Sequence, residues 1–250
     1  MELLDLGRKG YLETLEIQKK VLEERIAGRI PDTLILVEHS PIYTVGRAMS
    51  KTQEYPQSIV VPDVETVPVL AVDRGGKMTW HGPGQVVGYP IFKLAHKDVR
   101  RYLRDIEKVL CASVQMLGLP GRPTPENLEL EAGQLETGLW VGDRKIGSIG
   151  IHVKQWVSYH GFALNVHPDL RYFSAIEPCG FRGNIMSSVV DRLGAEASVD
   201  PAADTAHAKA ELFARTKDNL TSAFQELADY YEEVALAQPN AGRDPLDVDD

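Results

Sequence analysis

Apolar side chains in two stretches of the first half of the chain recur three or four positions apart. Residues 12–27 and 98–117 both show this spacing, which is that of one face of a helix. The first stretch is followed by Gly28, and glycine commonly marks the C-terminal end of a helix. The pattern predicts two amphipathic helices.

Short apolar runs predict strands. The runs at 33–39, 68–73 and 85–92 are bounded by proline or by glycine-rich segments. Residues 136–166 favour successive strands, with a hairpin turn at Gly142-Asp143. Helices combined with a largely antiparallel sheet make a two-layer α+β fold, with the sheet flanked by helices.

Charge divides the chain in two. Residues 196–250 hold 13 acidic and 4 basic side chains, a net charge of −9, whereas residues 1–195 hold 23 of each. We therefore expect a folded α+β domain over 1–195 and an acidic C-terminal extension over 196–250. The extension is expected to form a helix at about 205–235. Residues 239–250 are expected to be disordered, because they carry little apolar surface to bury.

Composition also excludes several classes of protein. The neutral body argues against a nucleic-acid partner, which would require a concentrated basic surface. No apolar run is long enough for a membrane helix, and the N-terminus lacks the pattern of a signal peptide. Two cysteines cannot build a disulfide scaffold. These features predict a cytoplasmic globular protein that does not associate with membranes.

Residues 74–85 (RGGKMTWHGPGQ) carry more glycine than a plain strand tolerates. Glycine in such a passage marks either a tight turn or the close approach of a ligand to the backbone. The segment matches neither nucleotide-binding glycine pattern. From the residues alone, a turn and a binding loop are equally supported.

Lys145 begins a second unusual segment, KIGSIGIHV. Regular strand alternation would put it on one face with Gly147, Ile149, Ile151 and Val153. On such a face the lysine either extends its ammonium group to solvent or is partly buried. Burial would lower the pKa of the ammonium group and make it a usable base or a partner for a thiolate.

The two cysteines have different surroundings. Cys111 lies within the predicted helix among apolar neighbours, which is typical of an unreactive core thiol. Cys179 lies in a loop framed by Pro178 and Gly180, where a nearby cation would activate it as a nucleophile. The histidines form no metal-binding motif, so no metal site is predicted. They are His39, His81, His96, His152, His160, His167 and His207.

Four cations are spaced along the helix predicted at 98–117 and just before it: Lys97, Arg101, Arg104 and Lys108. Such a stripe is most often a solvated helix face. The alternative is a docking stripe for an acidic protein partner.

Four segments taken together resemble a known family: EHSPIYTVGR (38–47), RGGKMTWHGPGQVVGYPI (74–91), KIGSIGIHVKQWVSYHGFALNV (145–166) and PCGFRGNIMSSV (178–189). They are similar, in the same order, to the bacterial octanoyltransferases, the lipoyl(octanoyl) transferases of the biotin/lipoate protein ligase superfamily. The similarity runs from about residue 3 to 194.

The resemblance implies an acyltransferase. Cys179 would attack octanoyl-acyl carrier protein and carry the octanoyl group as a thioester, with Lys145 as its partner. The acceptor would be a lysine of a lipoyl domain, in E2 subunits of 2-oxoacid dehydrogenases or in the glycine cleavage H protein. The resemblance implies no cofactor and a monomer. The alternatives are an ATP-dependent lipoate protein ligase and a non-catalytic module that binds lipoyl domains or carrier protein.

The resemblance also implies substrate-binding residues. Trp80 replaces the usual tyrosine and Gly147 the commoner alanine, which would reshape the acyl pocket. Backbone N–H groups near Gly82 or Gly180 are expected to stabilise the oxyanion. The implied substrate-binding residues are Arg74, Gly75, Gly76, Lys77, Met78, Thr79, Trp80, His81, Ser148, Ile149, Gly150, Gly161, Phe162 and Ala163.

Overall fold

A computed structural model describes residues 1–50, 54–124, 137–176, 185–196 and 205–237. The short strand β8 (Gly121–Pro123) follows the helix predicted at 98–117, and residues 125–136 lie outside the described residues. So do the predicted disordered tail and Cys179.

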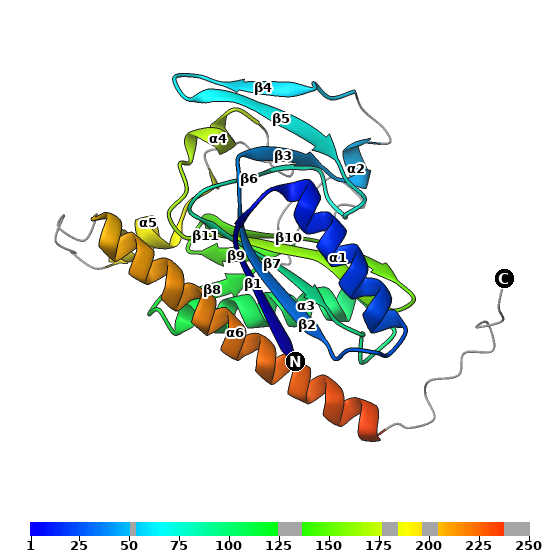
Figure 1. Cartoon of the computed structure of the whole chain (residues 1–250). Helices are drawn as coiled ribbons and strands as arrows, with labels where there is room; N and C mark the ends of the chain where they lie inside the picture. Colours follow the sequence, from blue (N-terminus) through cyan, green and yellow to red (C-terminus); the bar gives the residue numbers. More distant parts are fainter. Residues whose placement is uncertain (51–53, 125–136, 177–184, 197–204, 238–250) are drawn as a thin grey trace.

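The centre of the molecule is a seven-stranded sheet, counted over the described residues (Figure 1). Every neighbouring pair is antiparallel except the first, β1 with β2. The strand order is β1 (Glu2–Lys9), β2 (Thr33–His39), β7 (Gln85–Ile91), β11 (Val157–Asn165), β10 (Arg144–Lys154), β9 (Gly138–Val141) and β8.

A smaller sheet lies beyond one end of the large one, at the top of Figure 1. Its order is β4 (Ser58–Val61), β5 (Glu65–Ala71), β3 (Ile42–Val45) and β6 (Met78–His81). The one-turn helices α2 (Arg47–Ser50) and α4 (Arg171–Ser174) lie beside it. The glycine-rich residues 74–85 therefore enter β6 and lead from the small sheet into the large one.

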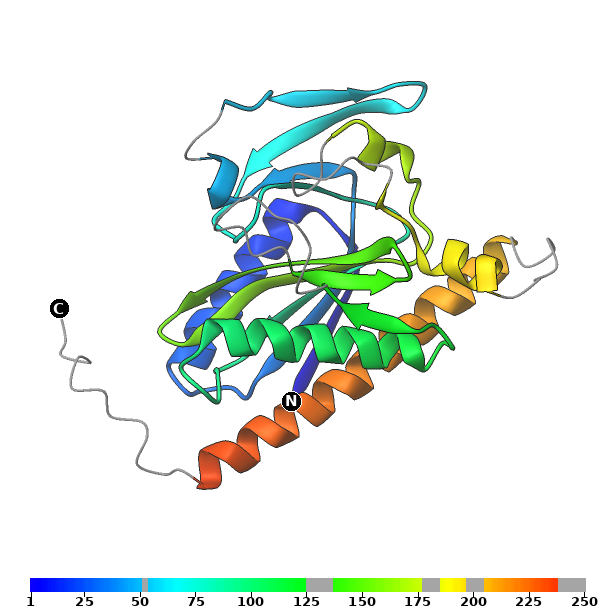
Figure 2. The same ribbon diagram turned by 180° about the vertical axis from the view of Figure 1, so that it is seen from behind.

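The two predicted amphipathic helices cover opposite faces of the large sheet (Figures 1 and 2). Helix α1 (Tyr11–Ile26) contributes Leu22 to a buried cluster that also contains Val87 and Tyr89 of β7. Helix α3 (Val99–Gln115) packs on the other face, and its N-terminus is capped by the Asp98 carboxylate, which accepts from two backbone N–H groups. We refer to these surfaces as the α1 face and the α3 face.

The acidic extension contributes a long helix, α6 (Ala206–Ala237), which follows α5 (Val189–Glu196). It crosses the α3 face beside α3 (Figure 2), and four of its side chains, Leu220, Phe224, Leu227 and Tyr231, are buried in the same core cluster as the sheet. Phe224 stacks on Phe162 of β11 with ring centroids 5.4 Å apart. The helix at the expected position is thus part of the main core.

The described structure confirms the predicted fold class, a mainly antiparallel sheet flanked by helices. No described helix combines the length and apolar character needed to cross a membrane. Three of the four cations of the basic stripe bond to side chains of α3 and α6: Arg101 to Tyr230, Arg104 to Glu107 and Lys108 to Asp105. The role of the stripe as a docking surface stays a prediction.

Candidate functional site

A pocket lies between the α1 face of the large sheet and the strands of the small sheet. Ten of the predicted substrate-binding residues line it: Arg74, Gly76, Thr79, His81, Ser148, Ile149, Gly150, Gly161, Phe162 and Ala163. The lining residues that the sequence analysis did not propose are Tyr11, Val87, Tyr89, Thr137 and His160. Val87 and Tyr89 lie in the apolar run at 85–92, which indicated only a buried strand, and Tyr11 lies just before the first predicted helix.

The remaining predicted residues lie next to this lining. Gly75 donates its N–H to the carbonyl of Ile151 at 2.9 Å and so joins the loop to β10. Trp80 is fully buried on β6, where its ring stacks on Tyr172 at 4.5 Å. It belongs to a separate cluster under the small sheet, and Met78 on the same strand is also buried. Lys77 precedes that strand. The Trp80 side chain is therefore not among the residues that line the pocket.

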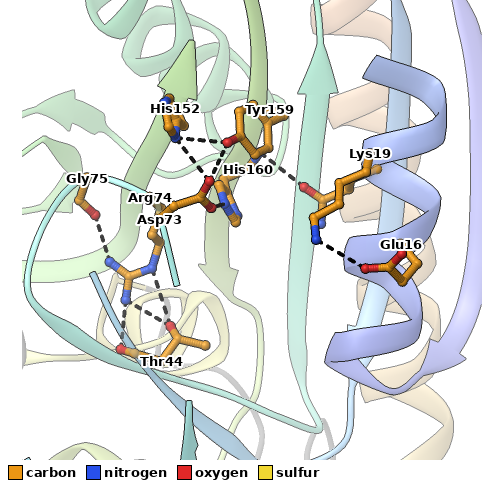
Figure 3. Close-up of polar contacts among 10 residues, drawn as sticks. Glu16, Lys19, Thr44, Asp73, Arg74, Gly75, His152, Tyr159 and His160 are labelled. Atoms are coloured by element: carbon orange, nitrogen blue, oxygen red, sulfur yellow. Dashed lines mark hydrogen bonds and ion pairs between the residues drawn. The ribbon is translucent and has the colours of Figure 1, made fainter. Parts of the chain in front are cut away.

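Arg74 anchors the glycine-rich loop (Figure 3). Its guanidinium donates to the carbonyl and the hydroxyl of Thr44, both at 2.8 Å, and to the carbonyl of Gly75 at 2.8 Å. A side chain at Gly46 would meet the carbonyl of Gly76 at 2.3 Å, so this close approach requires glycine. The arginine ties the loop to β3 and leaves its glycines at the pocket wall.

His81 is held neutral beside Arg74. Its Nδ1 lies 2.9 Å from Oε1 of Gln85, which can only accept, so Nδ1 carries the proton. Nε2 lies 3.3 Å from the Thr44 hydroxyl. Burial, aided by neighbouring positive charge, lowers the pKa of His81 well below its ordinary value. His81 therefore presents a neutral imidazole to the pocket.

An irregularity in β10 corrects the expected placement of Lys145. Lys145 pairs with Trp140, but Gly147 pairs with the adjacent Leu139, so Ile146 is an extra residue in the ladder. Directly paired residues share a face, and consecutive residues of β9 alternate between faces. Lys145 and Gly147 are therefore on opposite faces of the sheet. The regular alternation that placed them together was wrong because of this bulge.

The bulge puts Lys145 on the same face as Ser148 and Gly150, which line the pocket. The side chain is 1% exposed, so the lysine is buried rather than extended to solvent. A Cβ at Gly138 would lie 2.7 Å from its Cε, which shows how closely β9 packs on the lysine stem.

The buried Glu107 of α3 fixes this part of β9. Its Oε1 accepts the backbone N–H groups of Gly138 at 3.1 Å and of Thr124 at 3.3 Å, while Oε2 accepts from Arg104 at 2.7 Å. A carboxylate with three donors is satisfied without water. Glu107 thus connects helix α3 to the strand that contacts Lys145.

The chain that follows the Cys179 segment returns beside Lys145. Met186 pairs with Lys145 in an isolated parallel bridge, and the Ser187 N–H donates to the Lys145 carbonyl at 2.9 Å. Cys179 precedes Met186 by seven positions and lies outside the described residues. The same holds for Gly180, one of the glycines considered for the oxyanion.

A second irregularity turns His160 toward the α1 face. His160 has a φ of +55°, in the left-handed region, and its ring stacks on that of the preceding Tyr159. Its Nε2 lies 2.7 Å from a carboxylate oxygen of Asp73, and Asp73 also contacts Tyr159 and His152 (Figure 3). Hydrogen bonds from His160 and Tyr159 lower the pKa of Asp73. The sequence signal was only a histidine before a glycine, which does not reveal a positive φ.

Cys111 differs sharply from a reactive cysteine. It is buried in the main core on α3, and burial raises the pKa of its thiol to about 11. Among the described residues, no cluster of three or more His, Cys, Asp or Glu side chains could hold a metal ion.

Comparison with known proteins gives consistent matches. The family model for the lipoyl protein ligase A/B catalytic domain matches residues 10–210. An octanoyltransferase of Rubrobacter xylanophilus is 42% identical over 76% of this chain and 82% of its own length. One of Syntrophotalea carbinolica is 39% identical over 80% of this chain and 87% of its own.

Solved structures share the fold at low identity. A lipoate protein ligase of T. acidophilum with bound lipoic acid has a TM-score of 0.61 at 15% identity, covering 95% of this chain and 93% of its own. A lipoate-protein ligase A bound with ATP has a TM-score of 0.61 at 14% identity, covering 96% and 94%. With the family model over most of its length and relatives near 40% identity, the chain belongs to the lipoyl protein ligase A/B catalytic domain family, among its octanoyltransferases.

Proposed function

We propose that this chain transfers an octanoyl group from octanoyl-acyl carrier protein to a lysine of a lipoyl domain, with Cys179 as nucleophile and Lys145 as its partner. The observation that carries the proposal is the placement of Lys145. It is a buried lysine on the pocket side of the sheet, bonded through its carbonyl to Ser187, in the segment that follows Cys179. The names of the relatives support octanoyl transfer as the reaction.

In the first half-reaction, the Cys179 thiol gives its proton to Lys145 and the thiolate attacks the thioester carbonyl. The tetrahedral intermediate collapses, the bond to the carrier's sulfur breaks, and Lys145 returns the proton to that leaving thiolate. The products are free carrier thiol, an octanoyl thioester on Cys179 and a neutral Lys145.

In the second half-reaction, the neutral amine of the acceptor lysine attacks the Cys179 thioester. The amide bond forms, the Cys179 thiolate leaves, and Lys145 takes the proton released by the amine before returning it to the sulfur. Converting a thioester into an amide is downhill, so the reaction as written requires no ATP, metal or organic cofactor.

The pocket supports an acyl chain as the transferred group. Small residues form much of its wall on β10 and β11, where a side chain at Gly161 would meet the carbonyl of Gly88 at 2.0 Å. Burying a methylene group contributes about 0.8 kcal/mol, so an eight-carbon chain would gain on the order of 5 kcal/mol. The oxyanion is assigned to backbone N–H groups near Gly82 or Gly180.

The ATP-dependent ligase alternative is less well supported. Similarity to the solved ligases lies at 14–15% identity and extends to the fold alone, whereas the relatives near 40% identity are named octanoyltransferases. A non-catalytic binding module would retain the pocket but would not need a buried lysine beside the returning segment. The proposal further places the protein in the cytoplasm as a monomer. Its acceptors would be E2 subunits of 2-oxoacid dehydrogenases and the glycine cleavage H protein.

Intact-mass spectrometry after incubation with octanoyl-acyl carrier protein, without ATP, tests the proposal. We expect the protein to gain one octanoyl group, located on Cys179 by peptide mapping, and to lose it when a lipoyl domain is added. Strict dependence on ATP would favour the ligase, and no mass gain under either condition would favour the binding module.

A further inference from the structure

A chain of buried hydrogen bonds leads from the pocket wall to Lys145. His81, which lines the pocket, is bonded to Gln85 at 2.9 Å, and Gln85 Nε2 donates to Oδ1 of Asn165 at 2.9 Å. Asn165 Nδ2 donates to the carbonyl of Ser187 at 3.0 Å. The Ser187 N–H then donates to the carbonyl of Lys145 at 2.9 Å. All five residues are at least nine-tenths buried.

The direction of each bond is determined by its neighbours. The Arg74 guanidinium can only donate, so the Thr44 hydroxyl accepts from it and is free to donate to Nε2 of His81. His81 Nδ1 then donates to Gln85, which places Gln85 Nε2 toward Asn165 and toward the Trp80 carbonyl. Asn165 must therefore accept on one side and donate on the other, which an amide side chain does.

Residues 185–188, which we call the Ser187 segment, depend on side-chain support because they are not part of a regular strand. Its pairing with β10 is the isolated bridge between Met186 and Lys145, at the point where the bulge interrupts the regular pairing of β10 with β9. Asn165 is the last residue of β11 and bonds this segment to the body of the sheet. Val190 adds one backbone bond to Val166 further along.

From this arrangement we propose that Asn165 is a positioning residue for acyl transfer: by bonding to the Ser187 carbonyl, it holds the segment that follows Cys179 in register against Lys145. The proposal rests on the proposed function, because it acts through the pair formed by Cys179 and Lys145. Gln85 is a second positioning residue, since its hydrogen bond sets the orientation of the Asn165 amide.

Two near-isosteric substitutions test the assignment. Asn165→Asp keeps an acceptor for Gln85 but turns an oxygen toward the Ser187 carbonyl. Gln85→Glu leaves Asn165 unchanged but removes the donor that orients it. We expect each variant to lower the single-turnover rate of Cys179 octanoylation at least tenfold, with the KM for octanoyl-acyl carrier protein within twofold of wild type. Leu220→Ala on α6 is the matched control, since it also weakens the buried core but lies outside this hydrogen-bond chain.

The pH dependence of iodoacetamide alkylation at Cys179 provides a readout that general destabilisation does not move. For both amide variants we expect the midpoint to shift upward, because the thiolate loses its aligned cation, and for Leu220→Ala we expect no shift. All comparisons are made at a temperature where circular dichroism shows each variant folded. If either folded amide variant showed the same single-turnover rate and the same alkylation midpoint as Leu220→Ala, the role of Asn165 would be overturned. Failure of the wild-type protein to form the Cys179 adduct would instead count against the proposed function.

Discussion

The Cβ that Gly138 lacks would lie 2.7 Å from Cε of Lys145 and 2.4 Å from the carbonyl oxygen of Gly147. The first contact is with a side chain that the proposed mechanism needs in place, and the second is with backbone that cannot move independently. Glycine at this position therefore does more than form a strand end, because it leaves the space through which the lysine stem passes.

Gly138→Ala should accordingly impair both stability and transfer. Overpacking of this kind typically costs about 1–3 kcal/mol, and displacement of Lys145 should lower kcat at least tenfold. Urea unfolding and steady-state kinetics measure the two effects. Gly10→Ala is the control, because its Cβ would meet nothing within 4 Å and its φ is −63°. Equal kcat values in the two variants would show that the Gly138 contact does not constrain Lys145.

Cys179→Ala and Lys145→Arg test the two proposed catalytic groups. Cys179→Ala should abolish both turnover and formation of the acyl-enzyme. Lys145→Arg keeps a positive charge but provides a poor base of different shape. We expect its rate to fall on the order of 100-fold, the range of general-base contributions, while the protein remains folded. Intact mass and single-turnover kinetics measure both outcomes. Appreciable transfer by Cys179→Ala, or a wild-type rate for Lys145→Arg, would remove that residue from the mechanism.

Helix α6 should be needed for stability although it lies in the acidic extension. Phe224 is fully buried between Phe92 and Phe162, and Phe162 lines the pocket. Phe224→Ala should lower the free energy of unfolding by about 3–5 kcal/mol, as for other large-to-small core changes. Leu236→Ala on the same helix should change it by less than about 0.5 kcal/mol, because Leu236 is 74% exposed. Chemical denaturation of the two variants decides whether the extension is integral to the core.

The sequence was sufficient for the parts of the fold that follow regular periods. Helices α1 and α3 and strands β2, β7 and β11 lie within a few residues of the positions that apolar spacing predicted. Strands β1, β3, β4 and β6 were missed. Three of them, β1, β4 and β6, lie at sheet edges, and the four-residue strands β3, β4 and β6 give little alternation to detect. For residues 196–250 the sequence predicted acidity and a helix at about 205–235, which α6 confirms, but not that Phe224 and its neighbours on this helix complete the main core.

The site was harder to predict because it depends on departures from regular structure. The pocket-lining glycines could be predicted from the segments that resemble the family. The face on which Lys145 lies could not, because it depends on a bulge that strand alternation does not reveal. The position of the His160 side chain depends on a positive φ. The hydrogen bonds on which the proposed roles of Asn165 and Gln85 depend form only when β7, β11 and the Ser187 segment are brought together.

The burial of His39 predicts that the protein loses stability in mild acid. It is buried between the Lys9 carbonyl, 2.9 Å from Nδ1, and the Tyr89 hydroxyl, 2.7 Å from Nε2. Burial lowers the pKa of its imidazole from 6.5 to about 4. Below pH 6.5 the unfolded chain therefore binds a proton that the folded protein does not. The contribution of His39 to stability is fully present above pH 6.5 and is lost progressively as the pH falls toward 4.

His39→Gln isolates this contribution, because glutamine can donate to the Lys9 carbonyl and accept from Tyr89 without titrating. Between pH 7.5 and pH 5 the wild-type protein should lose about 2 kcal/mol more unfolding free energy than the variant. Urea unfolding at the two pH values measures the difference, and the comparison cancels the titration of groups that are common to both proteins and lie away from His39. The same pH dependence in both would mean that His39 takes up a proton as readily in the folded protein as in the unfolded chain, contrary to its burial.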